Sequence, residues 1–186
     1  MARKDVRIKD LLIEPYHMVL DDVIKEHKYM WIILTSGRAG AKSSGVSIIA
    51  NSKVVRDKDC SGIILRKHHN KLRKTVYKEY LRAITRMGIN KTRSYEITKS
   101  PMEVRYKKHG NTVYFTGSDS VDDTKGIIDE NKPIKFVVLD ELTEFFDDGE
   151  GEVLMKIRAA GVDETCGVLE VGPGIGPLTQ ELCKNA

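Results

Sequence analysis

Three short apolar runs are the feature of this sequence that most restricts its fold. They cover residues 29–34 (Tyr-Met-Trp-Ile-Ile-Leu), 62–65 (Gly-Ile-Ile-Leu) and 134–139 (Ile-Lys-Phe-Val-Val-Leu). Runs of this length, nearly free of polar residues, are typical of strands that are covered on both faces of a parallel sheet. The three runs therefore predict a core of about three strands.

The stretches between these runs have the spacing of helices. Residues 8–28 predict one or two helices, residues 46–54 a helix after the first run, and residues 72–87 a helix that ends near Gly88. Residues 104–115 predict a hairpin that turns at Gly110 and Asn111, a pair able to supply the positive φ of a tight turn. Together they predict an α/β fold, with a mostly parallel sheet and flanking helices.

A loop rich in small residues joins the first apolar run to the next helix, the context that a Walker A phosphate loop requires. It consists of Ser36, Gly37, Arg38, Ala39, Gly40, Ala41, Lys42, Ser43 and Ser44. In this interpretation the loop amides and Lys42 bind the phosphates of ATP, and the Ser43 hydroxyl binds Mg²⁺. Ser36 and Ala41 replace the two glycines of the motif, so an ordinary strand–turn–helix with an exposed lysine remains the alternative.

The third apolar run ends on Asp140 and Glu141, the pattern of a Walker B strand. A parallel strand would deliver Asp140 to the carboxyl edge of the sheet, where its carboxylate can hold Mg²⁺, while Glu141 can act as the general base for water. Arg38 in the loop can contact the γ-phosphate and is a second candidate catalytic residue. The alternatives are an ordinary strand end and a solvent-exposed arginine. The two motifs in this order predict an ATPase whose mostly parallel sheet is P-loop NTPase-like.

Charge is strongly segregated along the chain, although the formal net charge is only +4. Residues 66–108 hold 14 Lys and Arg against three acids, and residues 119–152 hold 12 acids against three lysines. The basic block suits a polyanion, but it could equally be a solvated helix face. The acidic block could hold a cation or pair with the basic one.

Several classes of protein are not expected. The longest apolar stretch has six residues, far below the roughly 20 of a membrane helix, and the charged start has no signal-peptide core. Three cysteines are an odd number without zinc-site spacing, which favours a reducing compartment.

Residues 37–44 resemble the phosphate loop of phage terminase large subunits of the PBSX-like group. Residues 63–67 with 72–76, residues 113–120 and residues 125–127 resemble segments of the same family, in family order, so the resemblance spans about residues 10–149. It implies the ATP- and Mg²⁺-dependent motor domain that packages double-stranded DNA in the host bacterial cytoplasm, with the terminase small subunit and the portal as partners. Residues 1–149 would form an incomplete domain, because the coupling motif and the nuclease domain are not found after it. Nuclease activity is therefore not expected, and ATP turnover is an open question.

The last part of the chain has a different character. Residues 168–171 predict a strand that runs into a glycine-rich turn with Gly172, Gly174 and Gly176, followed by a helix at residues 178–182. Residues 158–184 resemble the first S-adenosylmethionine motif of ribosomal RNA adenine dimethyltransferases. One strand and one helix bury too little surface to form that cofactor site alone, so residues 150–186 are interpreted as a short βα tail rather than a domain. A methyltransferase fragment, an inactive chimeric fragment and a DNA-binding module without catalysis are the alternative functions.

Overall fold

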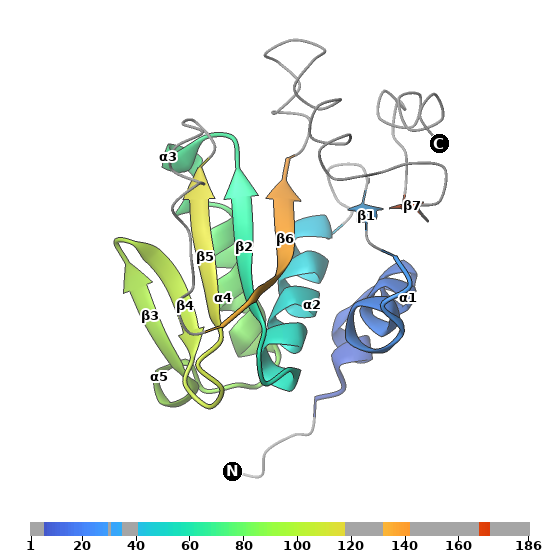
Figure 1. Ribbon diagram of the computed structural model, residues 1–186, viewed down its shortest axis with the longest axis horizontal. Coiled ribbons are helices and arrows are strands. Elements are labelled where there is room, and N and C mark those ends of the chain that lie inside the picture. Colours follow the sequence, from blue (N-terminus) through green and yellow to red (C-terminus); the bar gives the residue numbers. More distant parts are fainter. Residues whose placement is uncertain (1–5, 30, 35–40, 118–131, 142–167, 172–186) are drawn as a thin grey trace.

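A five-stranded mixed sheet forms the centre of the molecule in the computed structural model, which describes residues 6–29, 31–34, 41–117, 132–141 and 168–171. The strands lie in the order β3-β4-β5-β2-β6 (Figure 1). Their bounds are β2 Ser61–Arg66, β3 Tyr95–Lys99, β4 Met102–Tyr106, β5 Thr112–Gly117 and β6 Ile134–Asp140. Strands β5, β2 and β6 run parallel, whereas β4 and β3 are antiparallel additions at one side. The predicted α/β class is therefore confirmed.

Two helices, α2 (Lys42–Arg56) and α4 (Val76–Arg86), lie side by side against one face of this sheet (Figure 1). The larger hydrophobic core lies between them and the strands, and Tyr80 of α4 is fully buried in it. The ring of Phe115 on β5 meets those of Tyr77 and Tyr80 edge to face, at centroid distances of 5.0 and 5.5 Å. The apolar stripe predicted for residues 72–87 thus lies mainly on the face of α4 that packs on the sheet. The single helix predicted there is divided, because Leu72 ends a separate short helix, α3 (His69–Leu72).

A buried polar contact joins three elements inside this core. Asn51 of α2 accepts hydrogen bonds from the hydroxyls of Tyr80 (3.2 Å) and Tyr95 (2.7 Å). Each hydroxyl therefore has a partner, which removes most of the free-energy cost of burying it. The contact fixes α2 against α4 and β3.

A second hydrophobic cluster packs the N-terminal segment against α2. Its elements are the 3₁₀ helix η1 (Ile8–Leu11), helix α1 (Pro15–Asp21) and the π-helical turn η2 (Asp22–Glu26), as the spacing of residues 8–28 predicts. Ile48 and Ile49 of α2 belong to this cluster, whereas Ala50 and Val54 belong to the larger core. Helix α2 is therefore the shared wall of two cores.

The first apolar run does not join the large sheet in the part of the chain that the structure describes. Strand β1 (Trp31–Leu34) pairs in parallel with β7 (Val168–Val171) to form a separate two-stranded sheet. Ile32 and Leu34 pack on the N-terminal cluster, to which α1 and α2 contribute. The expectation that all three apolar runs lie in one sheet is wrong in this respect. The helix expected at residues 178–182 lies outside the described residues.

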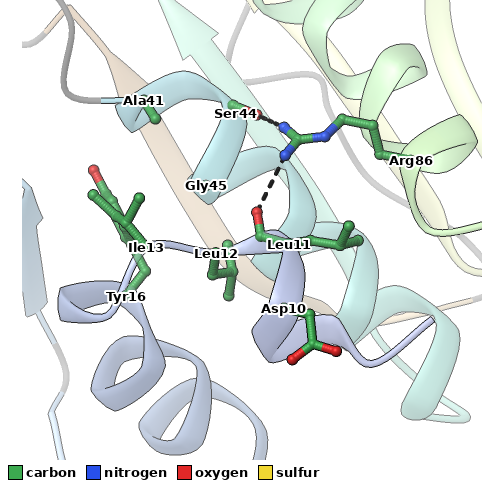
Figure 2. A pocket seen from close by; sticks show the side chains of 9 residues that line it. All are labelled: Asp10, Leu11, Leu12, Ile13, Tyr16, Ala41, Ser44, Gly45 and Arg86. Carbon is green, nitrogen blue, oxygen red and sulfur yellow. Dashed lines mark hydrogen bonds between the residues drawn. The ribbon is translucent and has the colours of Figure 1, made fainter.

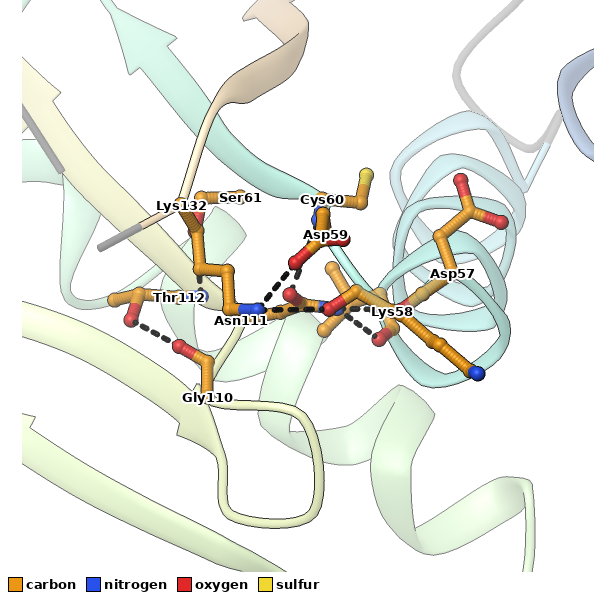
Figure 3. Close-up of polar contacts among 10 residues, drawn as sticks. Asp57, Lys58, Asp59, Cys60, Ser61, Gly110, Asn111, Thr112 and Lys132 are labelled. Carbon is orange, nitrogen blue, oxygen red and sulfur yellow. Dashed lines mark hydrogen bonds and ion pairs between the residues drawn. The ribbon is translucent and has the colours of Figure 1, made fainter.

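The turns at the amino edge of the sheet are tied together by one buried side chain, that of Asn111 (Figure 3). Its amide donates to the carbonyls of Val54 (2.9 Å) and Asp57 (2.7 Å), and its oxygen accepts from the backbone N–H of Cys60 (3.0 Å). The predicted hairpin therefore exists, but its turn spans residues 107–111, and Gly110 alone within it has a positive φ (76°). Among the described residues no helix is long and apolar enough to cross a membrane.

Candidate functional site at the carboxyl edge

The start of α2 lies at the carboxyl edge of the parallel strands, where β2, β5 and β6 also end (Figure 1). Ala41 precedes the helix with φ 52° and ψ 20°, a left-handed conformation, and its carbonyl accepts the first helical hydrogen bond from Gly45 (2.8 Å). This conformation explains why a Walker A loop usually has glycine at this position. The predicted site residues Ser36, Gly37, Arg38, Ala39 and Gly40 lie outside the described residues.

Asp140, the last residue of β6, is brought to Ser43 in the first turn of α2, 97 positions away in the sequence. The Ser43 hydroxyl donates to Oδ1 of Asp140 at 3.4 Å. The guanidinium of Arg66 donates to the other oxygen, Oδ2, at 3.3 Å. Both side chains of this ion pair are largely buried, with 10% of Arg66 and 14% of Asp140 exposed.

Burial has the largest effect on the pKa of the Asp140 carboxylate. Desolvation raises the pKa of Asp140, and the nearby charge of Glu141 raises it as well. Arg66, the hydrogen bond from Ser43 and the charge of Lys42 act in the opposite direction and favour the ionised form. Glu141 is exposed and has φ 53°, a conformation that non-glycine residues rarely adopt. Lys42, Ser43, Asp140 and Glu141 thus gather at one edge, as the two motifs require.

The side chains at this edge fit a magnesium ion. A serine hydroxyl and an aspartate carboxylate are hard oxygen ligands of the kind that Mg²⁺ takes, with water and phosphate oxygens completing its shell. Ser43 and Asp140 offer two such atoms from different elements within 3.4 Å. They therefore form the part of a magnesium site that the protein would supply.

A recess of about 190 Å³ opens beside the same turn of α2 (Figure 2). Ala41, Ser44 and Gly45 form one wall, and the opposite wall comes from the N-terminal segment. The other lining residues are Asp10, Leu11, Leu12, Ile13, Tyr16 and Arg86. Arg86 crosses the recess, since its guanidinium donates to the Ser44 hydroxyl and to the carbonyl of Leu11 (3.2 Å).

Sequence reasoning missed two parts of this site, Arg66 and the recess. The signal for Arg66 was available, because it directly follows the predicted strand at residues 62–65, and the carboxyl ends of parallel strands meet at one edge of a sheet. In the structure Arg66 and Asp140 are register partners. No sequence signal marked the recess, since its N-terminal wall is ordinary apolar spacing.

Comparisons with known proteins identify the family of this chain and agree with its fold. The sequence model of the phage terminase large subunit family matches residues 27–168. The chain is 24% identical over 155 residues to the terminase large subunit of Bacillus phage SPP1; the match covers 82% of this chain but only 35% of the length of that relative. A large terminase from a thermophilic bacteriophage has the same fold, with a TM-score of 0.57 at 19% identity, over 92% of this chain and 43% of that one.

The tail has a relative of its own. A stretch of 30 residues is 60% identical to the ribosomal RNA small subunit methyltransferase A of Macrococcus caseolyticus, but it covers only 16% of this chain and 10% of that enzyme. The terminase match is far more extensive and includes both motif strands. The chain belongs to the phage terminase large subunit family.

Proposed function

We propose that this chain binds ATP and Mg²⁺ at the carboxyl edge and is the motor part of a DNA-packaging terminase, in which ATP hydrolysis drives double-stranded DNA translocation. The contact between Ser43 and Asp140 is the main support for this proposal, because it joins the first turn of α2 to the acidic end of β6. Residues 1–149 form the ATPase part. The small subunit and the portal are its partners, and the host bacterial cytoplasm is its location.

Each polar group at this edge has a role in the proposed reaction. Lys42, Ser44 and the amides of residues 36–44 bind the phosphates, while Ser43 and Asp140 hold Mg²⁺. The bound ion neutralises charge on the phosphate oxygens. Glu141 positions the attacking water and accepts its proton, and its exposure leaves it open to solvent water. Arg38 contacts the γ-phosphate.

The recess beside α2 suits the base of the nucleotide. It lies next to Ser44 and Gly45, which follow the phosphate-binding lysine, and it contains the apolar side chain of Leu12 and the ring of Tyr16. Its volume is below the roughly 300–1,000 Å³ typical of sites for whole ligands. The adenine base is therefore the part of ATP that it would accommodate.

The basic block gives the proposed DNA partner a surface. Lys78 and Arg82 are exposed and lie four residues apart on α4, so they share one side of the helix. Lysines and arginines of this kind bind the DNA backbone through its phosphates, and the affinity then falls steeply with salt.

The test is a titration of Mg·ATP into the wild type, Lys42→Ala and Lys58→Ala. Lys58 is an exposed lysine in the turn after α2, at the opposite edge of the sheet. Lys42→Ala should weaken binding at least tenfold, because it removes a charge-assisted contact to phosphate of about 1.5–3 kcal/mol. Lys58→Ala should bind as the wild type does. Equal binding by all three proteins would remove the nucleotide site, and with it the motor function.

A further inference from the structure

Arg66 is a largely buried charge at the carboxyl edge to which neither motif gives a role. We propose that Arg66 is a positioning residue that acts as the counter-ion of Asp140 in the nucleotide-free protein and gives up one carboxylate oxygen when Mg²⁺ binds. The inference rests on the proposed function, because it concerns the same Mg²⁺ site.

The backbone register gives the first argument. Arg66 and Asp140 are paired residues at the ends of the neighbouring parallel strands β2 and β6. Side chains of paired residues leave the sheet on the same face, so the strand pairing itself holds the guanidinium beside the carboxylate. The ion pair is therefore built into the sheet and does not depend on a flexible loop.

Occupancy of the carboxylate gives the second argument. Ser43 uses Oδ1 of Asp140 and Arg66 uses Oδ2, so each oxygen already has a hydrogen-bond donor. The two bonds measure 3.4 and 3.3 Å, at the long end for hydrogen bonds. A cation that takes an oxygen of Asp140 as a ligand must therefore displace a donor or share the oxygen with it.

Charge balance selects Arg66 as the donor that leaves. A largely buried carboxylate needs a positive partner, and with Mg²⁺ absent the partner in contact with it is the Arg66 guanidinium. Once a divalent ion supplies that charge, a second cation against the same oxygens is repelled, whereas the neutral Ser43 hydroxyl is itself a suitable ligand for the ion. The released guanidinium remains at the strand end, where its planar fork suits two phosphate oxygens.

The experiment measures Mn²⁺ binding by electron paramagnetic resonance, without nucleotide, in the intact chain. Mn²⁺ is used in place of Mg²⁺ because it has a spectroscopic signal. Arg66→Gln should bind Mn²⁺ about three- to tenfold more tightly than the wild type, since the guanidinium that competes for Oδ2 of Asp140 is gone. Arg66→Lys keeps a cation and should stay within about twofold of the wild type. Arg93→Gln, at an exposed arginine of α5 (Lys91–Ser94) near the opposite edge, is the matched control and should change nothing.

Unchanged or weaker Mn²⁺ binding by folded Arg66→Gln would overturn the inference, because a purely structural arginine has no reason to oppose the metal. If Arg66→Gln does not fold, Arg66→Met is measured in the same way, and the same outcomes apply. The Mn²⁺ titration needs no nucleotide, so it judges Arg66 even if the ATP titration fails. If the wild type does not bind ATP, the proposed function is refuted. If the Mn²⁺ affinity of Arg66→Gln equals that of the wild type, only the role of Arg66 is refuted.

Discussion

The same substitution, alanine to glycine, should have opposite effects at two positions of the α2 region. Ala41 has a left-handed backbone before the helix begins, with φ 52°. This conformation costs a residue with a Cβ roughly 1–2 kcal/mol. Glycine removes that cost but loses about 0.4–1 kcal/mol through the greater freedom of the unfolded chain. Ala41→Gly should therefore stabilise the protein by about 0.8 kcal/mol.

Ala50 is the matched control, because it is a buried residue in the middle of the same helix. There, glycine loses roughly 0.5–1 kcal/mol of helix stability and about 0.8 kcal/mol from the missing buried methyl group. Ala50→Gly should destabilise the protein by about 1.3–1.8 kcal/mol. The two identical changes should thus differ by about 2–3 kcal/mol in the free energy of unfolding.

Urea unfolding followed by circular dichroism measures both effects. With a slope near 2 kcal/mol/M, the midpoint should rise by about 0.4 M for Ala41→Gly and fall by about 0.8 M for Ala50→Gly. The slope itself should not change. A lower midpoint for Ala41→Gly would show that residue 41 does not have the left-handed conformation, and the explanation of the Walker A glycine would fail with it.

Three further predictions concern buried groups away from the proposed catalytic edge. Asn111→Ala removes three hydrogen bonds worth about 1 kcal/mol each and should cost about 3 kcal/mol, whereas Asn70→Ala, at an exposed residue, should cost less than about 0.5 kcal/mol; equal costs in urea unfolding would contradict this. Gly62→Ala places a Cβ 2.1 Å from Cζ of Phe136 and should lower the free energy of unfolding by about 1–3 kcal/mol. A simultaneous Phe136→Leu should restore most of this stability. If the double variant is as unstable as Gly62→Ala, the ring of Phe136 is not the cause. Burial raises the pKa of the Cys60 thiol from 9.0 to about 11. Between these pH values the thiol keeps its proton in the folded protein but loses it in the unfolded chain. The free energy of unfolding should therefore fall as the pH rises from about 9 to about 11. Peptide mapping after thiol labelling at pH 8 should find Cys60 unmodified until the protein is unfolded, and labelling of the native protein would refute its burial.

Much of the fold could be predicted because its signals are local. The apolar stripe of α4 and the apolar runs of β2 and β6 appear in the sequence at the positions where the structure has these elements. The adjacency of Ser43 and Asp140 could be predicted as well, since the two motifs together place both residues at the carboxyl edge of the sheet. Strand β3 was missed, because its five residues have no run of apolar residues.

The remaining features depend on partners that are distant in the sequence. Strand β1 pairs with β7 rather than with the central strands, and a run of apolar residues cannot specify which neighbour it will have. Asn111 looks like a turn residue, yet its side chain is a buried tie between two turns. The roles of residues 36–40, and of every side chain assigned to catalysis, stay predictions.

The position of α2 between two cores has a mechanical consequence. The helix has 15 residues, so it is about 22 Å long, and side chains pack on opposite sides of it along this length. At its far end Asn111 holds the Val54 carbonyl, and the Lys53 ammonium donates to the Val23 carbonyl (2.9 Å). We therefore expect a phosphate bound at the first turn of α2 to shift the helix as a whole. The hairpin turn and the N-terminal helices would move with it. Slower hydrogen exchange of the backbone amides near Val23 and Cys60 on adding nucleotide would indicate this coupling between the two ends of α2.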